Sequence, residues 1–359
     1  MKQSSVDLLA ELSNLDGPSG YEAEVARYVA AHLSDTGAVA YDNLGSVICE
    51  VAGSADSPRV MLAAHIDEIG FMVKHVTEEG YLVLSALGGW WDQVLLAQAM
   101  TVLTSKGPIP GVIASKAPHL LTEEERNKVV KRQDMFLDIG ARDKQQAMEK
   151  LGVLPGDAVV PATRFHRMAD PDMLMGKAWD DRAGVAVMIE TLQALADKQH
   201  PNTVFGVGTA QEEVGLRGAQ TSVQTIAPQV ALVLEVAICG DVPGTKDSEA
   251  DVKLGGGPTV YIFEGSAIPN LRLRDMAMET CKELGFECQV SALERGGTDA
   301  GRIHVHASGV PSVVLGVPAR HIHAHTGIIE LNDYRQTVEL TVALVRKLDA
   351  DTVASLRPQ

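Results

Sequence analysis

The alternation of apolar and amphipathic segments after about Met173 constrains the fold of this chain more than any other feature. Apolar runs with the length and composition of buried β-strands occupy residues 201–210, 230–238 and 310–319. Segments with helical spacing of apolar residues lie between and beyond them, at residues 180–198, 270–285 and 333–349. This alternation predicts a β-sheet covered by helices.

The residues before this alternating region fall into two parts of different character. The first part begins with an amphipathic helix, and Ser19–Glu22 fits a capping box at the start of a second helix. From about Phe71 to about Arg164, short strands alternate with Gly/Pro turns, which is typical of a β-rich unit. We therefore expect an α/β domain formed by residues 1–69 and 165–359, interrupted by a β-rich domain at residues 70–164.

The composition excludes several classes of function. The chain of 359 residues has a formal net charge of −16, so it has no basic field that would attract the phosphates of a nucleic acid. No apolar run is long enough to cross a membrane, and the N-terminal segment has no apolar signal core. None of the four cysteines forms a CxxC pair, which argues against a thiolate zinc site. The expected location is the reducing cytoplasm.

Histidine and carboxylate side chains stand where the predicted strands end or the next helix begins, except for Glu235, which lies inside an apolar run. They are His65, Asp67, Asp180, Asp181, Glu212, Glu213, Glu235, Asp241, His321, His323 and His325. In an open α/β sheet, ligands gather at the carboxyl ends of the strands. Each residue alone has a simpler explanation, such as helix capping by the aspartates or solvent exposure of the histidines. Together they predict a metal site, because imidazole nitrogens and carboxylate oxygens without thiolates suit Zn²⁺, Co²⁺ or Mn²⁺.

The number of acidic residues suggests two ions bridged by one carboxylate, an arrangement that serves metal-assisted hydrolysis. Glu212 and Glu213 are adjacent, so their side chains point to different sides of an extended segment. We expect them to divide the work, with one binding a metal ion and the other acting as general base toward a water. Asp67 lies two residues after His65 and is placed to orient that histidine.

Several segments of the chain together resemble one known family. They are AAHIDEIGFMV, GKAWDDRAG, TAQEEVGLRGA, GGTDAGRIH and RHIH, and they are spread over nearly the whole chain. With them the sequence resembles the glutamyl aminopeptidase or tetrahedral (TET) aminopeptidase family of dinuclear metallopeptidases, some members of which are called endoglucanase M. The resemblance implies a mixed-sheet, helix-covered metallo-exopeptidase domain with an inserted, barrel-like dimerisation domain. It also implies that dimers assemble into a hollow homododecamer.

The resemblance implies a role for each site residue. The implied metal ligands are His65, Asp180, Glu213, Glu235 and His323. Asp180 would bridge two divalent ions, most readily Zn²⁺ or Co²⁺ and then Mn²⁺. Glu213 would bind the ion opposite Glu235 or share the ion of His65. The other implied site residues are Glu212 as general base, Asp67 as the residue that orients His65, and Gly297, Thr298 and Asp299 in a loop near the substrate.

Three positions depart from the family pattern. Glu235 stands where Asp is more common, His321 stands where an aromatic residue is usual, and His325 is additional. The expected activity is the removal of N-terminal amino acids from short peptides by a metal-dependent aminopeptidase. The alternative is another metal-dependent hydrolase on the same scaffold, such as a deacylase or a carboxypeptidase. A glycosidase fits less well because it needs paired carboxylates but no metal, and a non-catalytic shell protein would not need the full set of site residues.

Overall fold

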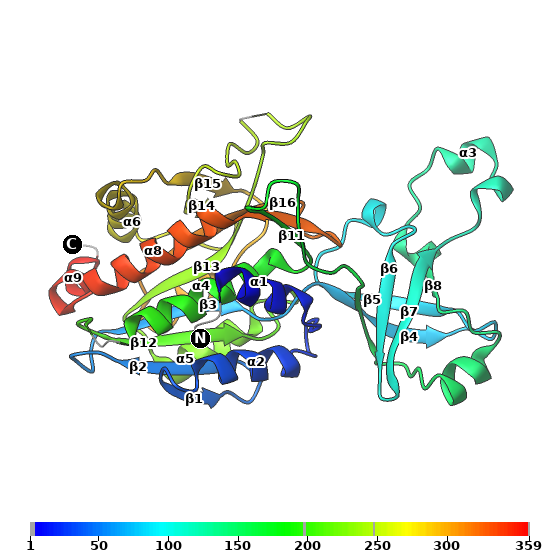
Figure 1. Cartoon of the computed structure of the whole chain (residues 1–359), viewed down its shortest axis with the longest axis horizontal. Coiled ribbons are helices and arrows are strands. Elements are labelled where there is room, and N and C mark those ends of the chain that lie inside the picture. Colours follow the sequence, from blue (N-terminus) through cyan, green and yellow to red (C-terminus); the bar gives the residue numbers. More distant parts are fainter. Residues whose placement is uncertain (1–3, 197–198, 247, 358–359) are drawn as a thin grey trace.

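The structure is a computed structural model that describes residues 4–196, 199–246 and 248–357. It consists of a helix-covered sheet and a closed β-barrel that projects from one end of the sheet (Figure 1). The predicted fold class, an α/β mixed sheet with an inserted β-rich domain, is confirmed by this architecture. The helix predicted at 180–198 ends at Leu195, and positions 197 and 198 lie outside the described residues.

The larger part is a mixed sheet of eleven strands, counted over the residues that the structure describes. The strands are β1 (Ala38–Tyr41), β2 (Val47–Ala52), β3 (Arg59–His65), β10 (His166–Arg167), β11 (Met173–Gly176), β12 (Thr203–Thr209), β13 (Val230–Ile238), β14 (Thr259–Glu264), β15 (Gln289–Leu293), β16 (Ser312–Arg320) and β17 (Gly327–Glu330). Their order is β1–β2–β12–β3–β13–β16–β17–β11–β10, with β14 paired to both β16 and β15. The central strands β12, β3, β13 and β16 are parallel, so their carboxyl ends lie at one edge of the sheet.

Helices cover both faces of this sheet. They are α1 (Ser5–Asn14), α2 (Ala23–Leu33), α4 (Trp179–Leu195), α5 (Arg217–Ile226), α6 (Leu271–Leu284), α7 (Ala300–Ile303), α8 (Leu331–Lys347) and α9 (Ala350–Ser355). Alternate residues of β3 serve the two faces, with Val60 and Leu62 in one apolar core and Met61 and Ala63 in the other. The first core is covered by α1, α2, α4, α6, α8 and α9, and the second by α5 and α7. Among the described helices, none has the length and apolar character needed to span a membrane.

The smaller part is a closed antiparallel barrel. Its strands are β4 (Gly70–Val76), β5 (Leu82–Leu87), β6 (Ala99–Thr104), β7 (Gly107–Ala114), β8 (Phe136–Asp138) and β9 (Ala158–Pro161), closed in the order β4–β5–β8–β7–β6–β9. Short helix α3 (Glu123–Arg126) lies in the long connection from β7 to β8. The barrel has its own apolar core, which includes Phe71, Val102 and Leu137. Since strands of the main sheet precede β4 and follow β9, the barrel interrupts the larger part in the sequence.

The predicted capping box at Ser19–Glu22 is wrong. Helix α2 begins at Ala23, and no side chain caps its N-terminus. The Ser19 hydroxyl instead donates to Asp67 Oδ2 at 2.6 Å, and the Glu22 carboxylate accepts from the backbone N–H of Gln211 at 3.0 Å. Both side chains therefore connect this segment to the loops that follow β3 and β12, rather than beginning the helix.

Candidate active site

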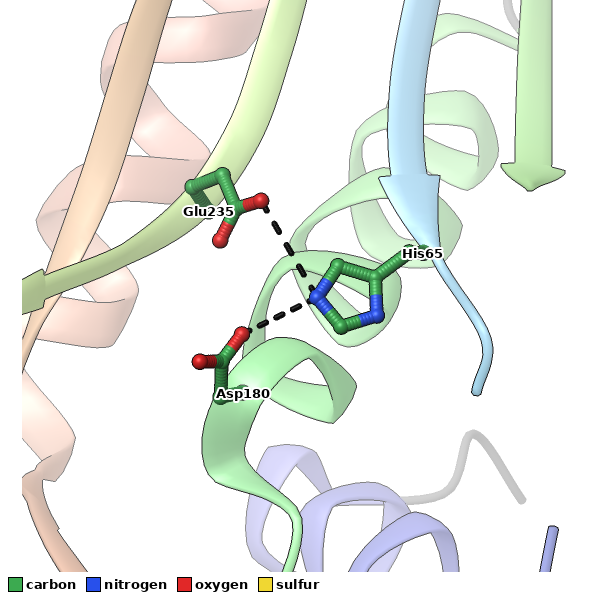
Figure 2. A group of neighbouring side chains, drawn as sticks. All are labelled: His65, Asp180 and Glu235. Atoms are coloured by element: carbon green, nitrogen blue, oxygen red, sulfur yellow. Dashed lines mark hydrogen bonds and ion pairs between the residues drawn. The ribbon is translucent and has the colours of Figure 1, made fainter. Parts of the chain in front are cut away.

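The carboxyl edge of the sheet brings together residues from distant parts of the chain. His65 is the last residue of β3, and Glu235 lies on the neighbouring strand β13. Asp180 lies in the first turn of α4, which packs against these strands. Figure 2 shows these three side chains pointing toward one another from three separate elements. The packing of α4 against β3 and β13 therefore brings these residues together.

These three residues form the first candidate metal group, called the His65 group below. His65 Nε2 lies 2.9 Å from Asp180 Oδ1 and 3.9 Å from Glu235 Oε1. One donor atom from each residue lies within 4.8 Å of the other two. His65 and Glu235 are buried, so bulk water does not compete at this position.

Asp180, Glu213 and His323 form a second candidate group, called the His323 group below. His323 Nε2 lies 3.3 Å from Asp180 Oδ2 and 3.7 Å from Glu213 Oε1. Asp180 therefore belongs to both groups, with one carboxylate oxygen facing each histidine. Glu213 is grouped with His323 and not with His65.

Asp67 is buried beneath both glutamates of the TAQEE segment. The His65 ring nitrogen Nδ1 is 3.1 Å from the main-chain oxygen of Asp67 and 3.5 Å from its carboxylate Oδ1. The same carboxylate accepts from the backbone N–H of Glu212 at 2.9 Å and of Glu213 at 3.2 Å. Burial alone would raise the pKa of Asp67, but hydrogen bonds from His65, Ser19 and the Glu212 backbone lower it. Asp67 is thus placed to orient His65 and also to hold the Glu212–Glu213 backbone.

Asp181 is a site residue that sequence reasoning did not assign. It is fully buried, and its carboxylate accepts from the backbone N–H of His65 at 3.1 Å and of Gly184 at 3.0 Å. It therefore joins the end of β3 to the start of α4, the two elements that carry His65 and Asp180. The adjacent pair of aspartates was the available signal, but helix capping explained that pair equally well.

Glu212 lies beside the two groups without being a member of either. Its Oε2 is 4.0 Å from His65 Nε2, and the residue is 8% exposed. Burial raises the pKa of Glu212 well above its usual value, and the nearby Glu235 adds to the effect. Burial likewise raises the pKa of Glu235 well above its usual value and that of Glu213 to about 7.

This electrostatic pattern fits a site for cations. Buried carboxylates that face one another favour the protonated form, and a bound cation stabilises their ionised form instead. Imidazole nitrogens and carboxylate oxygens are donors that Zn²⁺ and similar divalent ions prefer. The residues present therefore fit a divalent metal centre.

The loop at Gly297–Asp299 reaches the same edge of the sheet. Asp299 is buried, and its Oδ2 accepts from the hydroxyl of Thr209, the last residue of β12, at 2.5 Å. Its other oxygen, Oδ1, has no hydrogen-bond partner within the described part of the chain. Thr298 and Gly297 instead pack on Glu264 and Ser266, and the Thr298 backbone N–H donates to Glu264 at 3.0 Å. Asp299 is the member of this loop that approaches the carboxylates of the site.

Some of the strand-end residues do not join the site. Asp241 is paired with Arg320, whose Nε donates to Asp241 Oδ1 at 2.8 Å, so this carboxylate anchors a loop. His325 is buried against Trp90, with ring centroids 5.0 Å apart. His321 is exposed and lines a small cavity together with Trp179 and members of the His323 group. Of the three histidines in RHIHAH, His323 is the one that faces Asp180.

The fold and the two histidine–carboxylate groups define a candidate metallohydrolase. Residues 45–340 match the family of M42 glutamyl aminopeptidases, and the chain belongs to this family. It is therefore a hydrolase that acts as an aminopeptidase. The suspected family resemblance is confirmed.

Individual relatives match nearly the full length of the chain. The putative aminopeptidase FrvX of Escherichia coli is 38% identical over 351 residues, which is 97% of each chain. The TET aminopeptidase from the Thaumarchaeota archaeon SCGC AB-539-E09 is 45% identical with a TM-score of 0.96, covering 98% of this chain and 99% of that one. The Pyrococcus horikoshii TET1 peptidase, which can assemble into a tetrahedron or a large octahedral shell, is 31% identical with a TM-score of 0.87, covering 96% and 100%.

Proposed function

We propose that this enzyme is a metal-dependent aminopeptidase that removes N-terminal amino acids from short peptides with two divalent ions per subunit. The position of Asp180 carries the proposal, because its Oδ1 lies 2.9 Å from His65 and its Oδ2 lies 3.3 Å from His323. A carboxylate between two histidines can bridge two ions. Glu235 would complete the ligands of one ion, and Glu213 those of the other.

The donor set favours Zn²⁺ or Co²⁺, with Mn²⁺ as a third candidate. The donors are imidazole nitrogens and carboxylate oxygens, and no cysteine belongs to either group. Availability competes with affinity in selecting among these ions. The choice among them is therefore a matter for direct measurement.

Glu212 is the proposed general base. Bound divalent ions would supply Lewis acidity, which polarises a carbonyl and lowers the pKa of a water. Glu212 would take the proton of the attacking water and return it to the leaving amine. Its carboxylate is free for this role because neither candidate metal group includes it. Burial raises the pKa of Glu212 well above its usual value in the metal-free protein, and bound cations nearby would favour the ionised carboxylate that can accept a proton.

Two other parts of the site would position the reactants. Asp67 would hold His65 in orientation and, through the backbone of Glu212, the general base as well. The Gly297–Asp299 loop, which contains Thr298, would lie beside the substrate. Within that loop, the unpartnered oxygen of Asp299 is suited to attract the ammonium group of a peptide N-terminus.

We also propose that the enzyme works in the cytoplasm as a homododecamer built from dimers joined through the barrel. The similarity to a TET peptidase that can assemble into a tetrahedron supports the assembly. The cysteines Cys49, Cys239, Cys281 and Cys288 are all unpaired, which agrees with a reducing location.

The test combines metal analysis with the variant Glu212→Gln. Purified protein should contain about two divalent ions per chain. Glu212→Gln should keep both ions and lower kcat on aminoacyl-p-nitroanilides by about 10²–10⁴-fold, because the base is lost while the ligands remain. Glu124→Gln, at an exposed position in the barrel, is the matched control and should behave as wild type. A Glu212→Gln enzyme that turned over normally, or that lost its metal, would remove Glu212 from the role of base.

A substrate panel completes this test. Aminoacyl-p-nitroanilides that differ in side-chain charge and size, assayed with Zn²⁺, Co²⁺ and Mn²⁺ in turn, identify the preferred residue and ion. Hydrolysis that survives complete removal of metal would contradict the metal mechanism.

A further inference from the structure

A segment of the barrel lies directly against the His323 group. It consists of Gly88, Gly89 and Trp90, which follow strand β5, and is called the Gly88–Trp90 segment. Trp90 anchors it to the barrel, because the ring is 7% exposed and stacks on Phe71 with centroids 5.0 Å apart. The indole N–H of Trp90 also donates to the main-chain oxygen of Gly70 at 3.0 Å. The position of the segment is therefore set by the barrel.

The glycines of this segment lie next to two of the three members of the His323 group. The carbonyl of Gly89 lies 2.6 Å from His323 Nδ1 and can only accept, so Nδ1 carries the proton. A Cβ atom at Gly89 would lie 3.1 Å from His323 Nδ1 and 3.3 Å from Cε1. A Cβ atom at Gly88 would lie 3.0 Å from Glu213 Oε2 and 3.2 Å from its Cβ. Consecutive glycines thus leave the space that the histidine and the glutamate occupy.

A second contact joins the same segment to the loop that carries His323. The His325 ring packs on the Trp90 ring, with centroids 5.0 Å apart. His325 is 5% exposed, and neither of its ring nitrogens has a hydrogen-bond partner among the described residues. Packing on Trp90 therefore links this additional histidine to the Gly88–Trp90 segment.

The His65 group is supported in a different way. The Nδ1 atom of His65 is paired with the main-chain oxygen of Asp67, two residues along the same loop of the larger domain. Glu235 is held on the central strand β13, and its Oε2 accepts from the backbone N–H of Val236 at 3.2 Å. The two histidines thus receive the same kind of support, a main-chain carbonyl at Nδ1, from two different domains.

We propose that the Gly88–Trp90 segment is a positioning element for one of the two ion sites. The Gly89 carbonyl holds His323 in the tautomer whose Nε2 is free to bind an ion, and the two glycines let Glu213 and His323 lie side by side. A carbonyl at the second nitrogen of a ligand histidine orients the ring and raises its basicity. The placement of the barrel then sets the affinity of the ion held by the His323 group, while the ion of the His65 group depends on the larger domain alone. This inference rests on the proposed two-ion function.

The test is a titration of metal-free protein with Co²⁺ in a calorimeter. The metal content after dialysis is a second readout. Gly89→Ala introduces a Cβ at a position whose backbone conformation alanine tolerates, so the contact with His323 is the main change. Gly111→Ala is the matched control, because its Cβ would meet barrel atoms at a similar 3.0–3.1 Å, away from the site. Wild type and Gly111→Ala should bind about two ions. Gly89→Ala should bind one of the two ions with unchanged affinity and the other about 10–100-fold more weakly.

A second pair of variants covers the case in which Gly89→Ala does not fold. Trp90→Phe keeps an aromatic ring but loses the N–H donated to Gly70, and it should also weaken only one of the two ions. Its control is Trp91→Phe, because Trp91 is 61% exposed, and it should match wild type. Equal weakening of both ions, or unchanged binding of both in the Gly88–Trp90 variants, would overturn the proposal. Failure of the wild-type protein itself to bind two ions would instead count against the proposed function.

Discussion

Two clusters of buried charge adjoin in this protein, and they are neutralised in different ways. In the first, called the Lys177 cluster, Lys177 Nζ lies 2.7 Å from both Asp16 Oδ1 and Glu68 Oε1, and buried Arg182 lies 4.0 Å from Glu68. The second is the active site, where carboxylates outnumber the histidines that face them. The first cluster contains its own cations, whereas the second needs protons or bound ions to reach the same balance.

The comparison separates a structural role from a chemical one. Lys177 precedes Asp180 by three residues, and Glu68 follows His65 by three, so the Lys177 cluster fastens the segments that carry the metal groups. Arg182 extends this connection by donating to the main-chain oxygen of Leu12 at 2.8 Å. A compensated cluster can hold a backbone in place without any ligand. A cluster in which the carboxylates are not balanced by protein cations is suited to binding a cationic ligand.

Of the changes that distinguish the two clusters, removal of metal should have the largest effect, and that effect is on aminopeptidase activity. Dialysis against a chelator should abolish aminopeptidase activity, because only the active-site cluster depends on added cations. The far-UV circular dichroism spectrum should remain that of the folded protein, because the Lys177 cluster contains its own cationic side chains. Activity that returned on addition of Zn²⁺, Co²⁺ or Mn²⁺ would complete the result. Unfolding upon chelation would show instead that the ions are needed to hold the fold.

Lys177→Met should cause the next largest effect, and it acts on the other cluster. The substitution keeps the side-chain length but removes the closer ion-pair partner of buried Glu68, so that only Arg182, at 4.0 Å, remains. Removing one partner of a buried ion pair costs about 3–5 kcal/mol. Urea unfolding of the metal-loaded protein measures this loss in the free energy of unfolding.

The double variant Lys177→Met with Glu68→Gln is the control for that experiment. It removes both charges, so it should recover part of the stability lost in Lys177→Met. A single variant as stable as wild type would contradict the view that Lys177 compensates Glu68.

The metal-free protein should also lose stability as the pH rises. A group whose pKa is raised in the native state binds its proton more tightly there than in the unfolded chain. Although burial opposes the charged form of His323, its hydrogen bond with Asp180 and the nearby carboxylates raise its pKa to about 10. Burial raises the pKa of Glu213 to about 7, so its stabilising contribution is complete below its usual pKa and is lost as the pH rises through about 7. Each pKa unit corresponds to about 1.4 kcal/mol.

Urea midpoints measured at about pH 5 and about pH 8, with and without metal, test this prediction. Metal-free protein should unfold at lower urea at the higher pH. Metal-loaded protein should not follow this trend, because metal ions bind the deprotonated ligands and bind better as the pH rises. Identical pH profiles with and without metal would mean that the carboxylates of the site are not what the ions stabilise.

The sequence was sufficient to predict features that depend on local pattern. Strand and helix alternation predicted the sheet, and the parallel strands placed His65, Glu212 and Glu235 at one edge, as the strand-end argument requires. Side-chain contacts between residues far apart in the sequence could not be predicted from local pattern. Ser19 has the spacing of a helix cap, but its hydroxyl is taken by Asp67, 48 residues away. Asp241 has the position of a ligand, but Arg320 pairs with it.

The contribution of the barrel to the site lies furthest from what sequence patterns can indicate. Gly88 and Gly89 look like an ordinary turn after a strand, and nothing near them in sequence points to His323, 234 residues from Gly89. The sequence also did not predict that Glu213 lies beside His323. Two adjacent glutamates in an extended segment must point in different directions, but the sequence does not show which residues each one faces. Such contacts follow from how the two domains are placed.

Disrupting a surface ion pair in the barrel should have the smallest effect on the free energy of unfolding. It provides the reference value against which the buried Lys177 cluster is compared. Lys128 Nζ pairs with Glu124 four residues earlier, and their side chains are 66% and 79% exposed. Solvent screens such a pair, so Lys128→Ala should change the free energy of unfolding by only about 0.2–1 kcal/mol. Urea unfolding in parallel with Lys177→Met makes the comparison direct, because each variant removes one lysine from one ion pair. If both lysines had equal effects, burial would not distinguish the Lys177 cluster from an ordinary surface pair, and its role in fastening the metal-binding segments would have no energetic basis.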